Sequence, residues 1–146
     1  MVTTVRHILE IKGNDIWSIG PDASVYDALR MMSDKDVGAL IVMENDRMVG
    51  ILSERDYARK VVLLGKTSRE TLVSEIMSTR IVTIHPDQTV EEAMELMNRK
   101  HIRHLPVVED ETTRELLGMI SLRDVVRTII HKQREAIKNL EGKVTS

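Results

Sequence analysis

The sequence predicts an α/β (α+β) fold, in which two β-α-β-β-α repeats pack about a pseudo-twofold axis as one module. The first observation is an internal repeat: residues 86–110 match residues 21–45 at nine of 25 positions, with a constant offset of 65. The second is the stretch GILSERD, which begins at Gly50 and returns as GMISLRD at Gly118, an offset of 68. Repetition at nearly constant spacing indicates that one supersecondary unit occurs twice.

The first elements of each repeat are a short strand and a helix. We expect strands over DIWSI (15–19) and RIVTI (80–84), each followed closely by Pro-Asp. Ser24 and Thr89 then occupy N-cap positions, and Glu92 can complete a capping box with Thr89. Apolar residues at helical spacing predict the buried faces, which are Val25, Ala28, Leu29 and Met32 in one copy and Val90, Ala93, Met94 and Met97 in the other.

Two strands and a second helix complete each repeat. The predicted strands are GALIVM (38–43), RMVGILS (47–53), RHLPVV (103–108) and ELLGMIS (115–121), and the helices are SERDYARKVVLLG (53–65) and SLRDVVRTIIHKQREAI (121–137). Outside them we expect a short helix in TVRHILEIKG that stops at Gly13, and a charged tail that frays. The predicted division is an N-terminal helix (1–13), a first repeat (14–70), a second repeat (71–132) and a tail (133–146).

Composition excludes several classes of protein. The 146 residues include no cysteine, which excludes a disulfide scaffold and a thiolate zinc finger. The net charge of −2, with one tryptophan and two tyrosines as the only aromatic residues, predicts no nucleic-acid partner. No stretch has the about 18 apolar residues of a membrane span, and the N-terminus lacks the apolar core of a signal peptide. We therefore expect no membrane partner and a cytoplasmic protein.

The repeated motif Gly-x-x-Ser-x-x-Asp places Ser53 with Asp56, and Ser121 with Asp124, where a strand gives way to a helix. Considered alone, either copy favours a structural interpretation, in which the serine is the N-cap and the aspartate interacts with the helix dipole. That interpretation leaves the glycine and the intervening arginine unexplained. Glycine admits a close approach to a strand, a helix N-terminus attracts phosphate, and a carboxylate accepts bonds from ribose hydroxyls. The motif therefore also predicts a ribose-phosphate cradle.

Two strand-helix-strand-strand-helix units that each close on this motif resemble a tandem pair of CBS domains, named after cystathionine β-synthase. The resemblance covers about residues 8–131, and SIGPD, GALIVME, VGILSERDYARKV and RHLPVVED are similar to stand-alone bacterial CBS-pair proteins. It implies two clefts between the repeats that bind adenosine-containing ligands: AMP, ADP, ATP, S-adenosylmethionine or NAD(H). It also implies a regulatory, signal-transducing module that is not an enzyme and has no catalytic cofactor.

The resemblance assigns roles residue by residue. The carboxylates that would hold the ribose hydroxyls are Asp56 and Asp124, with Ser53 and Ser121 beside them. The positions against the adenine edge are Ser18 and Thr83. The positions that line the base and phosphate ends are Val37, Gly38, Ala39, Ile102, Arg103 and His104, and Pro106 belongs to the same set. The candidate phosphate partners are Arg55, Arg103 and Arg123. The stretch VGAL (37–40) of the first repeat is neutral, whereas the equivalent IRHLP (102–106) of the second is basic. We therefore do not expect the two clefts to bind a ligand with equal affinity.

Two other functions stay open. One is an interaction module whose clefts remain empty and whose helical faces bind a regulated protein partner. The other is a small nucleotide hydrolase, which is less favoured because no general base, activated nucleophile or metal set lies near the predicted cradle. His101 and His104 could be a metal pair, but no further ligand stands at supporting spacing, so we expect no metal site.

We also expect a homodimer. The apolar run from Val61 to Leu64 spans more than one helical face, as does the set Val125, Val126, Ile129 and Ile130. In CBS pairs the corresponding helices pack against a second copy. A closed twofold dimer is the commonest arrangement for such a self-complementary surface.

Overall fold

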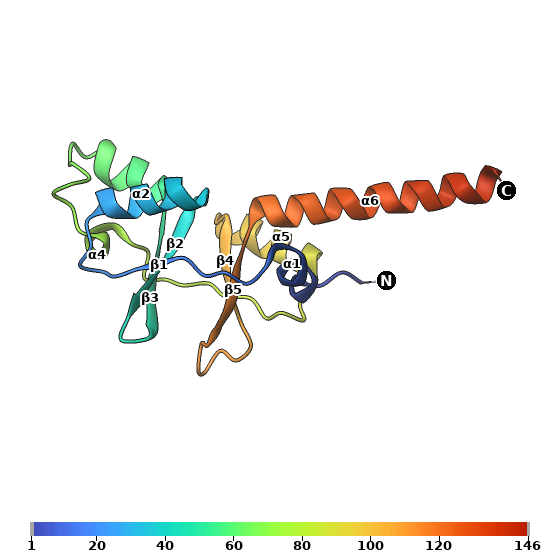
Figure 1. The fold of residues 1–146 in the computed structure, drawn as a ribbon, viewed down its shortest axis with the longest axis horizontal. Coiled ribbons are helices and arrows are strands. Elements are labelled where there is room, and N and C mark those ends of the chain that lie inside the picture. The colour runs from blue at the N-terminus through green and yellow to red at the C-terminus, as the bar shows by residue number, and fades with distance from the viewer. Residues whose placement is uncertain (1, 146) are drawn as a thin grey trace. The chain divides into compact units, whose positions relative to one another are not determined.

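The computed structural model describes residues 2–145, with side chains as far as Gly142. The chain forms two compact units (Figure 1): a first-repeat unit, Ile16–Val82, and a second-repeat unit that joins the chain up to Asp15 to the segment from Thr83 onward. The first-repeat unit contains β1 (Ser18–Ile19), α2 (Val25–Lys35), β2 (Ala39–Glu44), β3 (Arg47–Ser53), α3 (Glu54–Tyr57), the π-helical η1 (Ala58–Val62) and α4 (Val73–Ile76). The second-repeat unit contains α1 (Val5–Lys12), α5 (Val90–Lys100), β4 (His104–Val108), β5 (Leu116–Ser121) and α6 (Leu122–Thr145). Along this described part of the chain, no helix is long and apolar enough to cross a membrane.

Each unit has the same internal strand pairing and register. In the first-repeat unit β1 lies parallel to β2, and β2 lies antiparallel to β3. In the second-repeat unit β4 and β5 are antiparallel, and each antiparallel pair carries a bulge at the equivalent place. The pair Ala39–Ser53 of the first-repeat unit corresponds to His104–Ser121 of the second. In the same way, Val42–Gly50 corresponds to Val107–Gly118. The predicted α/β class with two repeats is therefore confirmed.

Helices α2 and α5 begin at the predicted caps. Ser24 Oγ accepts a hydrogen bond from the Asp27 amide at 3.1 Å. Thr89 Oγ1 accepts one from the Glu92 amide at 3.0 Å, and the Glu92 carboxylate accepts one from the Thr89 amide at 3.2 Å, which completes the capping box. Residues predicted for the apolar face are buried in both helices, namely Val25, Ala28 and Met32, and Val90, Ala93 and Met97. Spacing alone thus identified the core side of each helix.

Helices α1 and α4, which each lead into a repeat, pack in the unit of the other repeat. Helix α1 precedes the first repeat in sequence, but the Val5 amide donates to the Gln88 carbonyl at 2.9 Å, in the second-repeat unit. Helix α4 lies at the start of the second repeat in sequence, but the Val73 amide donates to the Ala23 carbonyl at 2.9 Å, in the first-repeat unit. The two bonds are equivalent under the offsets of 68 and 65. The repeats therefore exchange their leading helices.

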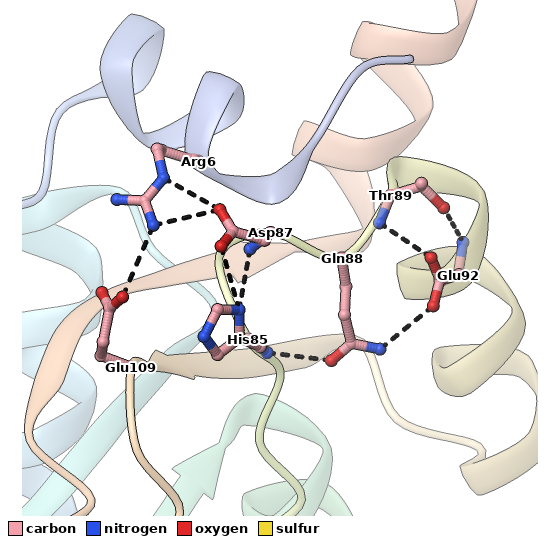
Figure 2. A network of polar contacts seen from close by, with 7 residues as sticks. All are labelled: Arg6, His85, Asp87, Gln88, Thr89, Glu92 and Glu109. Atoms are coloured by element: carbon pink, nitrogen blue, oxygen red, sulfur yellow. Dashed lines mark hydrogen bonds and ion pairs between the residues drawn. The ribbon is translucent and has the colours of Figure 1, made fainter.

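Side chains fix the position of α1 (Figure 2). Arg6 Nε and Nη2 donate to one oxygen of Asp87 at 3.2 and 3.1 Å, and Nη2 lies 3.6 Å from Glu109. Asp87 belongs to the turn that leads into α5, where the His85 amide donates to Gln88 Oε1 at 3.0 Å. These groups are largely exposed, so the ion pairs orient α1 rather than supply much of its stability.

The leading strands are shorter than predicted. DIWSI contributes only Ser18–Ile19 as β1, and RIVTI contributes a single parallel bridge between Ile84 and Val107. The Ile84 amide donates to the Pro106 carbonyl and its carbonyl accepts from the Val108 amide, both at 3.0 Å. The ladder ends there because Pro86 follows and has no N–H to extend it.

Two helices also differ from the predictions. The expected α-helix after Ser53 is α-helical only over Glu54–Tyr57 and continues as the π-helix η1. The tail was expected to fray, and this was wrong: α6 runs unbroken to Thr145. Good helix formers fill this segment, and Lys132 Nζ lies 3.1 Å from Glu91 of α5.

The glycine of each repeated motif accommodates the protein's own chain. A Cβ on Gly50 would lie 2.7 Å from Met77 Sδ and 2.9 Å from the Ser78 carbonyl oxygen. A Cβ on Gly118 would lie 2.8 Å from Leu9 Cδ2. We expected these glycines to admit a ligand. That space is filled by Met77 and Ser78, which follow α4, at Gly50 and by Leu9 of α1 at Gly118.

The two glycines differ in what surrounds them, which predicts unequal costs of substitution. Gly50→Ala should lower the free energy of unfolding by about 1–3 kcal/mol, because the backbone of Ser78 cannot move aside easily. Gly118→Ala should cost clearly less, because the tip of the Leu9 side chain can rotate away. Urea denaturation of both variants measures the difference, and equal losses would contradict this explanation.

Candidate functional site

The two strand-to-helix junctions have the same hydrogen-bond pattern. At the first, Ser53 Oγ accepts from the Asp56 amide at 3.2 Å, and Asp56 Oδ2 accepts from the Ser53 amide at 2.9 Å. At the second, Ser121 Oγ accepts from the Asp124 amide at 3.2 Å, and Asp124 Oδ2 accepts from the Ser121 amide at 2.8 Å. Each serine is therefore an N-cap, and each aspartate closes a reciprocal capping box. The structural interpretation of the motif is confirmed.

The caps leave both carboxylates within reach of solvent. The Asp56 side chain is 19% exposed and that of Asp124 is 16% exposed. A carboxylate has about four lone-pair sites, so a cap that uses one or two of them leaves acceptor capacity. The junctions can therefore be both structural caps and binding positions.

A lysine accompanies each aspartate. Lys60 Nζ lies 3.2 Å from Asp56 Oδ1 and donates to the Ile76 carbonyl at 2.9 Å. Lys12 Nζ lies 2.7 Å from Asp124 Oδ2 and donates to the Met119 carbonyl at 2.9 Å. Lys60 is one helical turn from its aspartate, whereas Lys12 comes from α1 at the other end of the sequence.

In the first-repeat unit the predicted residues gather at one end of the sheet. Ala39, at the start of β2, pairs with Ser53 at the end of β3, and the Glu54 amide donates to the Gly38 carbonyl at 3.1 Å. Ser18 pairs with Ile41 on the neighbouring strand and is exposed. The other predicted positions of this unit are Val37, next to Gly38, and Arg55 and Asp56, on α3.

In the second-repeat unit the equivalent residues form the same end of the sheet. His104 pairs with Ser121, and the Leu122 amide donates to the Arg103 carbonyl at 2.8 Å. Thr83 stands before the bridge at Ile84 and donates a hydrogen bond to Glu111. The remaining predicted positions are Ile102, before Arg103, Pro106, buried in β4, and Arg123 and Asp124, in the first turn of α6. Thr83 is thus engaged by a loop residue that sequence reasoning did not select.

Charge and burial set the protonation of this second junction. Burial acts to raise the pKa of Asp124, but hydrogen bonds from Lys12 and from Ser121 outweigh it, and the pKa lies below its ordinary value. Burial and, less strongly, the positive charge of Lys12 together lower the pKa of His104 to about 4, against a smaller opposing effect of Asp124. At neutral pH Asp124 is therefore a carboxylate and His104 a neutral imidazole.

Comparison with known proteins identifies the family. The CBS domain family matches residues 4–63 and again residues 73–131. The chain belongs to the CBS-domain family. It is 37% identical over 96% of its length to the mitochondrial CBS domain-containing protein CBSX3 of Arabidopsis thaliana, of which it covers 71%. A Burkholderia ambifaria structure, of a protein named for signal transduction and CBS domains, superimposes with a TM-score of 0.84 at 42% identity, covering 90% of this chain and 96% of the other.

Other members show the range of the family. The CBS pair of MJ0100, similar in fold at 23% identity and a TM-score of 0.77 over 90% of this chain and 99% of the other, was solved with 5′-methylthioadenosine and S-adenosyl-L-methionine. A cyanobacterial CBS-CP12 protein, 30% identical with a TM-score of 0.75 over 86% of this chain and 71% of the other, is a hexamer. Inosine-5′-monophosphate dehydrogenase of Methanocaldococcus jannaschii is 31% identical over 98% of this chain, which matches 27% of that enzyme. CBS pairs thus occur both in proteins of about this length and within enzymes.

Sequence reasoning missed the two lysines. A signal for Lys60 was available, because a lysine four residues after an aspartate on a helix can pair with it. Position 128, which corresponds to Lys60 in the second CBS repeat, is threonine, and its hydroxyl donates to the Asp124 carbonyl at 2.9 Å. No local signal could identify Lys12, because 112 positions separate it from Asp124.

His101 and His104, which could form a metal pair, lie at the end of α5 and in β4. Between Val2 and Gly142, no group of three or more His, Cys, Asp or Glu side chains is arranged to hold a metal ion. His104 is instead part of β4 beside the Ser121 junction, and His101 ends α5 in a left-handed conformation with φ of 56°.

The partly buried His104 predicts a pH dependence of stability. Between pH about 4 and 6.5 the unfolded chain binds a proton that the folded CBS repeat excludes, so stability falls as the pH falls through this window. Between pH 7 and pH 4, the free energy of unfolding of His104→Gln should fall by about 2 kcal/mol less than that of the unmodified protein. Urea denaturation at several pH values tests this, with His131→Gln, an exposed position on α6, as the control. An unchanged pH dependence in His104→Gln would show that the histidine is not responsible.

Proposed function

We propose that this CBS pair is a regulatory module that binds adenosine-containing ligands, such as AMP, ADP, ATP or NAD(H), and signals their presence without turning them over. The observation that carries the proposal is the doubled junction, with the same Ser-x-x-Asp sequence, strand register and partly exposed carboxylate in both repeats. Helix capping accounts for the serine and the aspartate of each junction. It does not require an arginine before each aspartate.

The chemistry around each junction suits a nucleotide. The carboxylates of Asp56 and Asp124 can accept hydrogen bonds from the two ribose hydroxyls. Arg55 and Arg123, one residue earlier on exposed helix positions, can pair with phosphate oxygens. Arg103 adds a second cationic side chain near Asp124, where the first repeat has the neutral Gly38. We therefore propose that the two junctions differ in affinity, the second favouring the more highly phosphorylated ligand.

The remaining predicted positions complete the proposed sites. Ser18 and Thr83 would lie at the adenine edge. The backbone positions that would line the base and phosphate ends are Val37, Gly38, Ala39, Ile102, Arg103 and His104, and Pro106 belongs to the same set. These assignments rest on the family resemblance and on the equivalence of the two registers.

Two alternatives predict different results. An interaction module with unoccupied sites would show no change in melting temperature with AMP, ATP, NADH or S-adenosylmethionine. A nucleotide hydrolase would convert ATP during incubation, which chromatography detects. We propose neither of these functions.

We propose a cytoplasmic location. The relative CBSX3 is mitochondrial, so imaging of the tagged chain is the test.

Ligand binding should separate the two roles of Asp124. Asp124→Asn retains an acceptor for the cap but weakens the bonds to ribose, so nucleotide affinity at one site should fall about tenfold or more. Asp56→Asn should do the same at the other site. Titration calorimetry with AMP, ATP and NADH measures both.

The matched control is Glu92→Gln, which makes the same change of charge in the capping box of α5, where the partners of Glu92 are Thr89 and Gln88. This control should lose a little stability through its weakened cap, without any change in nucleotide affinity. If Asp124→Asn behaves like Glu92→Gln, the aspartate is only a cap and the proposed site is wrong.

We also propose that the protein forms a homodimer. Val61 and Val125 are absorbed into the cores of their own units, but Val62, Leu63 and Leu64 are 53%, 76% and 64% exposed. Three consecutive exposed apolar residues on one short segment favour contact with another chain.

Light scattering should give twice the chain mass of 16.6 kDa. Leu63→Lys should return the mass to that of a single chain, whereas Leu140→Lys, at a similarly exposed leucine of α6, should not. A single-chain mass for the unmodified protein at micromolar concentration would exclude the dimer.

A further inference from the structure

The carboxylate proposed to bind ribose in the second repeat is held by a residue outside that repeat. Lys12, the last residue of α1, lies 2.7 Å from Asp124 Oδ2, while the Asp124 side chain is only 16% exposed. The same ammonium group donates to the Met119 carbonyl of β5 at 2.9 Å. Lys12 therefore covers the acceptor oxygen that also closes the capping box with the Ser121 amide.

The comparison between repeats indicates that this contact is not incidental. In the first repeat Lys60, on the same helix as Asp56, supplies the cation. In the second repeat the equivalent position is Thr128, whose hydroxyl is bonded to the Asp124 backbone carbonyl. A lysine still meets the aspartate, but it arrives from α1. The same charge pair is thus made twice by two different routes.

The two routes have different consequences for a ligand. Displacing Lys60 from Asp56 breaks an ion pair within one helical segment and affects the bond from Lys60 to the Ile76 carbonyl of α4, but it leaves α1 in place. Displacing Lys12 from Asp124 removes the side-chain ion pair at the end of α1, next to Gly13, whose amide is bonded to the Leu9 carbonyl at 2.8 Å. Residues 13–15 then lead directly into the first-repeat unit, which begins at Ile16.

We propose that Lys12 is a positioning residue that competes with the ligand for Asp124, so that nucleotide binding at the second repeat releases the C-terminal end of α1. This inference rests on the proposed function. A ribose diol can donate one hydrogen bond to each oxygen of a carboxylate, but Oδ2 of Asp124 already accepts from the Ser121 amide and from Lys12, so a hydroxyl can reach Oδ2 only by displacing Lys12. Lys12 thereby lowers the affinity of the second site for its ligand. When a ligand binds there, the end of α1 is released next to residues 13–15, which lead to the other repeat. The first site has no such coupling to α1.

Titration calorimetry with AMP tests the competition. Lys12→Gln should bind AMP about three- to tenfold more tightly at one site, the effect of one partly exposed ion pair. Lys12→Arg keeps the charge and should behave like the unmodified protein. The matched control Lys132→Gln breaks the Lys132–Glu91 pair in the same unit, 3.1 Å long, and should leave AMP affinity unchanged.

Hydrogen exchange tests the release of α1 without any substitution. Saturating AMP should speed exchange of the Gly13 amide in the unmodified protein, and Asp124→Asn should abolish that effect of AMP. This measurement decides the question even if Lys12→Gln does not fold.

The outcomes separate the inference from the function on which it rests. If Asp124→Asn loses AMP binding but Lys12→Gln binds AMP as the unmodified protein does, the competition is wrong and the proposed site stands. Weaker binding by Lys12→Gln would make Lys12 a ligand contact and would also overturn the competition. If neither the unmodified protein nor Lys12→Gln binds AMP, ATP or NADH, the proposed function fails and the inference fails with it.

Discussion

A helix that starts directly after a strand leaves its first amide groups without partners inside the helix, and this protein meets that requirement twice with a serine and an aspartate. Each capping box brings a carboxylate to the end of a sheet and keeps it partly exposed. The carboxylate then attracts a lysine, which also bonds to a backbone carbonyl. Local capping therefore dictates where the negative charge of the candidate site lies.

The exchange of leading helices determines what surrounds each junction. Because α1 packs in the second-repeat unit, Leu9 fills the space above Gly118 and Lys12 reaches Asp124. Because α4 packs in the first-repeat unit, Ile76 offers its carbonyl to Lys60, and the following residues fill the space above Gly50. The glycine of the motif is thus required by packing within each unit. This role is separate from any approach by a ligand.

Electrostatic balance distinguishes the second junction from the first. Lys12 and Arg103 both disfavour a charge on His104, and burial disfavours it more strongly. Asp124 remains ionised because its hydrogen bonds outweigh burial. The junction therefore holds one carboxylate, cationic side chains and a neutral imidazole at neutral pH, a combination suited to an anionic ligand that also offers hydroxyl donors.

The sequence by itself determined the elements that depend on neighbouring residues: the caps at Ser24 and Thr89, the antiparallel strand pairs, and the buried faces of α2 and α5. It also determined the Ser-x-x-Asp junctions, because capping involves residues only three apart. Only the tertiary structure decided that α1 and α4 are exchanged between repeats. It alone decided that Lys12 meets Asp124, because residues 112 positions apart are brought together by the path of the chain and carry no local signal of it.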